Sequence, residues 1–148
     1  MKQFCCTLLF FLATLTSYAQ NFADFFQDKT LRVDYIFTGD ANRQAIYLDE
    51  LSQLPSWAGR QHHLSELPLA GNGQIIVKDV ATGQCIYKTS FSSLFQEWLS
   101  TDEARTTAKG FENTFLLPFP KKTVEVEITL YSPRKDVMAN FKDIVSPE

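Results

Sequence analysis

The chain reads Thr123-Val124-Glu125-Val126-Glu127-Ile128-Thr129-Leu130-Tyr131, a strict alternation of apolar and polar side chains. Successive side chains of a β-strand point to opposite faces of the sheet, so this stretch predicts a strand with one buried and one solvated face. The side chains expected to point inward are Val124, Val126, Ile128 and Leu130, and those expected to point outward are Glu125, Glu127 and Thr129.

Other stretches also indicate strands. Residues 74–80 and 84–91 are rich in β-prone side chains and flank the short turn Ala81-Thr82-Gly83. Two such runs joined by a glycine-containing turn are the usual signal of a hairpin. A strand at 45–51 has a helical alternative, because the apolar side chains there also suit one face of a helix. The remaining strand-like runs cover residues 31–37, 111–119 and 137–145.

Helical signals are few. Residues 92–99 place apolar side chains at positions 94, 95, 98 and 99, after a serine that can cap a helix, and this spacing predicts one short helix. A second helical start is expected at 101–104, with Gly110 as its stop. Residues 21–29 fit either a leader strand or a loose tether.

The order of these segments indicates the fold class. Strand–helix–strand alternation is missing, which excludes a parallel α/β sheet. The sequence therefore predicts a mainly all-β fold, an antiparallel β-sandwich with one short helical insertion, and the immunoglobulin-like sandwich is one form of it. Because the composition changes only at Ala19, we expect residues 20–148 to form a single β-sandwich domain.

The N-terminal residues have the pattern of a secretory signal peptide. Lys2 precedes the apolar run 4–15, and small residues stand at Ser17 and Ala19. This pattern predicts cleavage after residue 19 and export to the periplasm, the cell surface or the medium. A transmembrane anchor is the weaker interpretation, because a bilayer span needs about 20 apolar residues. After cleavage of residues 1–19 we expect no membrane association.

Charge and cysteine content exclude further classes of protein. The chain has 14 Lys and Arg residues against 17 Asp and Glu residues, and it has no basic stripe of the kind that nucleic-acid binders carry. Cys5 and Cys6 lie within the predicted signal peptide, so Cys85 would stand alone in the mature chain. A single cysteine cannot form an intramolecular disulfide, and the fold must be stabilised by its core.

We find no catalytic or metal-binding motif in the residues. His62 and His63 are the only histidines, and adjacent side chains on an extended chain point to opposite sides, which does not suit a shared metal. Cys85 lies in a predicted strand, where the role of a small buried apolar side chain is expected instead of that of a nucleophile. The sequence therefore predicts no catalytic residue, no metal ligand and no cofactor.

Trp57 lies in a loop between Pro55 and Gly59. A buried tryptophan would plug one end of the sandwich, whereas an exposed one can stack on a sugar or anchor a protein partner. The second interpretation makes a candidate binding surface of Trp57, Arg60, His62 and His63.

Several longer strings of residues resemble those of a known family. The strings are Tyr47-Leu48-Asp49-Glu50-Leu51-Ser52-Gln53-Leu54-Pro55, Trp57-Ala58-Gly59-Arg60, His63-Leu64-Ser65-Glu66-Leu67-Pro68-Leu69, Gly71-Asn72-Gly73, Tyr87-Lys88-Thr89-Ser90-Phe91-Ser92-Ser93-Leu94-Phe95-Gln96-Glu97-Trp98 and Gly110-Phe111-Glu112-Asn113-Thr114-Phe115. With them the chain resembles the N-terminal domain of the IgA peptidase M64 family, whose members are secreted bacterial zinc metallopeptidases. The resemblance spans about residues 31–145.

The resemblance implies a β-sandwich that precedes a separate catalytic domain. In that family a His-Glu-x-x-His helix holds the zinc, and this chain has no such motif. The expected function is thus that of a non-catalytic accessory domain whose partner is the peptidase catalytic domain or a glycoprotein substrate, with the catalytic domain absent from this chain. The alternative is a stand-alone exported module that binds a carbohydrate or a glycoprotein.

Overall fold

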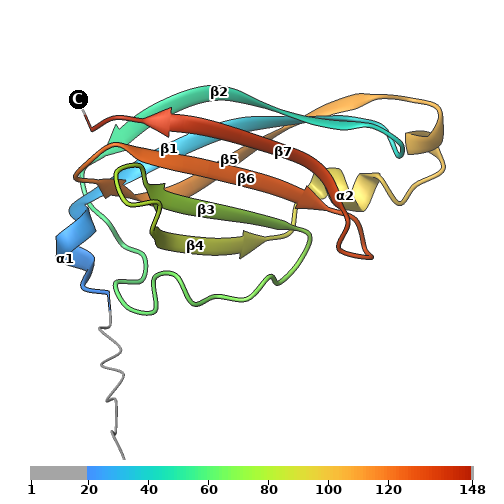
Figure 1. Cartoon of the computed structure of the whole chain (residues 1–148). Helices are drawn as coiled ribbons and strands as arrows, with labels where there is room; N and C mark the ends of the chain where they lie inside the picture. Colours follow the sequence, from blue (N-terminus) through green and yellow to red (C-terminus); the bar gives the residue numbers. More distant parts are fainter. Residues whose placement is uncertain (1–19, 148) are drawn as a thin grey trace, which may run out of the picture.

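The computed structural model describes residues 20–147 (Figure 1), so the predicted signal peptide at 1–19 lies outside the described residues. The described part contains seven strands, two short α-helices and one 3-10 helix. In chain order these are α1 (Phe22–Phe25), β1 (Phe26–Gly39), β2 (Gln44–Leu54), β3 (Gly73–Asp79), β4 (Cys85–Phe91), α2 (Leu94–Trp98), the 3-10 helix η1 (Glu103–Arg105), β5 (Lys109–Pro120), β6 (Val124–Tyr131) and β7 (Val137–Val145).

The strands form two antiparallel sheets, which confirms the predicted β-sandwich. One sheet has the order β2-β1-β5, and the other has the order β4-β3-β6-β7. A constant-type immunoglobulin domain instead pairs its first, second, fifth and fourth strands in one sheet. Here β4 stays beside β3 because a tight turn at Gly83 joins them, and β1 lies between β2 and β5. The sandwich therefore differs in strand order from that immunoglobulin type.

The predicted strands are present, and the ambiguous segment 45–51 is a strand. It belongs to β2, which pairs with β1 from Gln44 opposite Gly39 to Leu54 opposite Thr30. The prediction that Gly110 stops a helix is wrong. The helical turn η1 is already over at Thr106, and Gly110 pairs with Thr38 inside the β1–β5 ladder.

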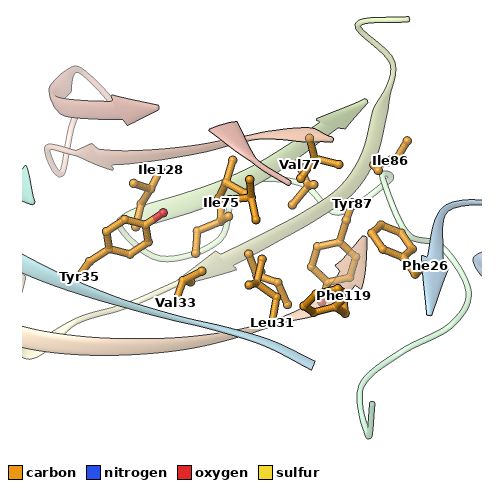
Figure 2. Close-up of a cluster of buried hydrophobic side chains, with 14 of the residues drawn as sticks. Phe26, Leu31, Val33, Tyr35, Ile75, Val77, Ile86, Tyr87, Phe119 and Ile128 are labelled. Atoms are coloured by element: carbon orange, nitrogen blue, oxygen red, sulfur yellow. The ribbon is translucent and has the colours of Figure 1, made fainter. Parts of the chain in front are cut away.

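The core lies between the two sheets. Figure 2 shows Leu31 and Val33 of β1 facing Ile75 and Val77 of β3, with the Tyr87 ring beside them. The four β6 side chains predicted to point inward are all buried. Segment 21–29, which the sequence left undecided, forms α1 and the start of β1, and α1 is capped by the Asn21 side chain, which accepts from the Ala23 N–H.

An aromatic cluster fills the end of the sandwich that lies farthest from α1. The Phe37 ring of β1 lies 5.9 Å from Phe91, 6.3 Å from Phe95 and 6.1 Å from Phe115, measured between ring centroids. The predicted helix at 92–99 is present as α2 and brings Phe95 to this cluster, with Ser93 as its N-cap. Helix α2 thus covers this end of the core.

We expect Phe37→Ala to lower the free energy of unfolding by about 3–5 kcal/mol, because it removes the buried ring at the centre of this cluster. Denaturant unfolding monitored by fluorescence measures the change. Leu94→Ala on α2 is the matched control, since its side chain is 70% exposed, and it should change stability by less than about 0.5 kcal/mol. Similar losses in both variants would contradict this account of the core.

Candidate binding surface

A long crossover connects β2 to β3 and covers the outer edge of β4. The Lys88 N–H of β4 donates to the Leu64 carbonyl at 2.8 Å, and the Ser90 hydroxyl donates to the Pro68 carbonyl at 3.0 Å. An uncovered edge strand presents unpaired backbone groups on which other chains can form strands. The crossover, residues 55–72, satisfies part of that edge from within the chain.

Trp57 begins the crossover and is buried, with 9% of its surface exposed. Its indole Nε1–H donates to the Arg60 carbonyl at 3.0 Å, and its backbone N–H donates to the Asp28 carboxylate at 3.3 Å. The ring packs edge-on against Tyr87, with the ring centroids 6.1 Å apart. Trp57 is therefore a plug at the end of the sandwich, and the interpretation as an exposed stacking platform is wrong.

Arg60 fastens the crossover to β4. Its guanidinium lies over the Tyr87 ring at 4.5 Å from the centroid, and its Nη2 donates to the carbonyls of Leu64 at 3.1 Å and of Lys88. Burial raises the pKa of Tyr87, and the nearby Arg60 charge opposes that rise only in part. The cation is thus directed at the chain's own carbonyls and at a neutral phenol ring.

The two histidines lie farther along the crossover, at the surface. His63 has a left-handed backbone, φ 52°, and its Nδ1 donates to the Glu66 carboxylate at 2.8 Å. The turn at His63 lets His62 and His63 line one hollow of about 200 Å³ together with Gln20. Of the four residues predicted to form one surface, Trp57 is buried, Arg60 is half-buried, and both histidines are exposed.

Cys85 does not have the surroundings of a nucleophile. The thiol is partly buried and donates to the Tyr87 carbonyl at 3.7 Å. Burial raises the pKa of Cys85, and the charges of Lys88 and Lys78 lower it by less. The reactive thiolate form is therefore disfavoured at neutral pH.

An apolar hollow lies on the outer face of the β2-β1-β5 sheet, where β2 ends. We call it the β2-end notch. Its volume is about 550 Å³, and it is bounded by Leu54, the segment 55–59, and Leu116 of β5, with Thr30 beneath. The Thr30 hydroxyl donates to the Ser56 carbonyl at 2.6 Å, which holds the segment against the sheet. Leu116 is 52% exposed, and neither leucine was among the predicted site residues.

The outer face of the other sheet is charged and paired. Lys78 lies 2.7 Å from Glu127, and Lys142 lies 3.2 Å from Glu125, measured between the nitrogen and carboxylate oxygen. Burial alone would raise the pKa of Glu127. Hydrogen bonds from Lys78 and Asn140, together with the two lysine charges, outweigh that effect and hold its pKa below the ordinary value. These carboxylates are engaged in a structural network.

Within residues 20–147, no three His, Cys, Asp or Glu side chains gather closely enough to hold a metal ion. In the same part of the chain, no helix is both long enough and apolar enough to cross a membrane.

Comparison with known proteins gives one family. The family model described as the peptidase M64 N-terminus matches residues 21–142. The match begins before α1 and ends within β7, so it takes in both sheets and the whole crossover. No curated protein matches the chain.

Gly59→Ala should displace the Trp57 indole, because a Cβ at Gly59 would lie 2.2 Å from a carbon of that ring. We expect a loss of about 1–3 kcal/mol in the free energy of unfolding, as for other overpacked sites. Urea unfolding measures it. The control is Gly110→Ala, whose Cβ would meet its nearest neighbours at 3.5 Å. Equal stability of the two variants would contradict the role of Trp57 as a plug.

The Glu127 network predicts a pH dependence. A carboxylate whose folded pKa is lowered stabilises the protein above its unfolded pKa, and this contribution is lost as the pH falls through the folded pKa. We therefore expect the wild-type free energy of unfolding to decrease as the pH falls below 4.5, the ordinary value for Glu, and the decrease to be smaller in Glu127→Gln. Urea unfolding between neutral and acidic pH tests this. The exposed Glu112→Gln should keep the wild-type slope, and a wild-type slope in Glu127→Gln would refute the assignment.

Proposed function

This chain belongs to the peptidase M64 N-terminal family, and from that membership we propose that it is a non-catalytic accessory domain of an M64-type peptidase. In this proposal it packs against the catalytic domain and helps to position a protein or glycoprotein substrate. The observation that carries the proposal is the family match over residues 21–142, which takes in most of the sandwich.

The arrangement of the motif residues supports a structural, non-catalytic role. Trp57 and Arg60, which carry part of the family resemblance, hydrogen-bond to each other and pack on Tyr87, and Gly59 lies against the Trp57 ring. Their positions are those of residues that build a scaffold, and none of them is aimed at a reacting substrate. The two histidines of the sequence are adjacent, whereas a zinc helix of the His-Glu-x-x-His kind needs them four residues apart on one helical face.

The alternative function is a stand-alone module that binds carbohydrate. Its motivation was an exposed tryptophan in a loop, and the indole of Trp57 is buried against Tyr87. The exposed tryptophan that would favour this alternative is therefore missing. Export to the periplasm, the cell surface or the medium remains part of the proposal, supported by the signal-peptide pattern of residues 1–19.

The proposal predicts two results with purified protein. The chain alone should hydrolyse neither immunoglobulin A nor a short peptide, and it should retain no stoichiometric zinc after dialysis. Added in equimolar amount to a separately produced M64 catalytic domain, it should lower KM for the protein substrate and leave kcat/KM for the short peptide unchanged, because only a large substrate reaches a second domain.

Hydrolysis by the chain alone, or one bound zinc per chain, would refute the non-catalytic assignment. An unchanged KM for the protein substrate would refute the positioning role. Denatured immunoglobulin A serves as the control substrate, since a domain that recognises folded surface should not affect its cleavage.

A further inference from the structure

Two hollows lie on either side of the last residues of β2. The β2-end notch, on the outer face of the sheet, is bounded by Leu54 and Leu116. The second hollow, of about 300 Å³, lies at the opposite side of the strand and is lined by Leu51, Phe119 and Val145. We call it the β7-end groove. Apolar side chains make up most of both linings, so this end of the sandwich offers apolar contact on two sides of β2.

The β7-end groove lies next to the residues that follow β7. Ser146 and Pro147, the residues that follow β7, line the β7-end groove, and Figure 1 shows the C-terminal end beside the end of β2. In the family to which the chain belongs, this domain is the N-terminal part of a peptidase. A domain joined after β7 therefore starts next to the groove and reaches the notch without a long linker.

The walls of the notch are held in place before any partner binds. The Thr30 hydroxyl donates to the Ser56 carbonyl, and the Trp57 N–H donates to the Asp28 carboxylate. A preformed apolar hollow loses little conformational entropy on binding, which increases the net affinity for a complementary apolar side chain. Leu116 is exposed on one wall, so its side chain is available to a partner.

The outer face of the second sheet is a poorer surface for the same contact. Lys78, Glu125, Glu127 and Lys142 cover it with paired charges. Covering such a network with a partner requires desolvation of all four groups, and that penalty can exceed what their mutual attraction returns.

We propose that the β2-end notch and the β7-end groove form the docking surface for the catalytic domain of the M64-type peptidase, which inserts apolar side chains into the notch. This inference rests on the proposed function and names the surface that it uses. The occupant it commits to is the peptidase catalytic domain joined after β7 or supplied as a separate subunit.

The test is a calorimetric titration of the chain, residues 20–148, with a separately produced M64 catalytic domain. Leu116→Glu should weaken binding by roughly tenfold or more, because it places a charge in the apolar contact. Ala58→Arg, a second variant on the opposite wall, should weaken it similarly by filling the hollow. Tyr47→Glu is the matched control, since Tyr47 is 59% exposed on β2 at the other end of the strand, and it should bind like the wild type.

The outcomes separate the two proposals. If the wild type, Leu116→Glu and Ala58→Arg all bind the catalytic domain with the same affinity, the docking surface is refuted. The accessory function would then still stand. Failure of the wild type to bind at all would overturn both. The thermal midpoints of all variants are measured first. If one of the two notch variants does not fold, the other one provides the test.

Discussion

The contact on which the rest of the structure depends is that between the Arg60 guanidinium and the Tyr87 ring, together with the Arg60 donations to the carbonyls of Leu64 and Lys88. Two sheets of three and four strands leave the edge of β4 open, and an open edge invites pairing with other chains. The Arg60 contacts hold the crossover over this edge, together with the hydrogen bonds that Lys88 and Ser90 donate to its carbonyls. The neighbouring segment 55–59 lies over Thr30, whose hydroxyl donates to the Ser56 carbonyl, and this segment forms one wall of the notch.

Much of the fold follows from local patterns. Strict alternation identified β6 and its inward face, and the turn at Gly83 identified the β3–β4 hairpin, because both signals lie within a few adjacent residues. The candidate site could not be predicted from local patterns, because its contacts join distant parts of the chain. The Trp57 N–H donates to the Asp28 carboxylate, and the Trp57 ring packs on Tyr87. Leu116 was missed because it stands beside Leu117 in an apolar run, and only pairing of Leu117 with Leu31 shows which leucine points outward.

The geometry assigns different parts of the molecule to structure and to contact. Burial and hydrogen bonds occupy Trp57 and Arg60, and paired lysines and carboxylates occupy the outer face of β3, β6 and β7. Three exposed apolar side chains, Leu51, Leu54 and Leu116, lie around the end of β2, next to the residues that leave β7. In the proposed function, the domain holds another protein in place and that partner supplies the chemistry.

The most direct test is hydrogen–deuterium exchange of the chain, residues 20–148, measured alone and with the M64 catalytic domain. The account predicts slower backbone exchange confined to residues 51–59, 115–118 and 143–147, which surround the notch and the groove. Slower exchange confined to the outer face of β3, β6 and β7, or to residues 62–66, would contradict it, as would a complex that leaves exchange unchanged everywhere.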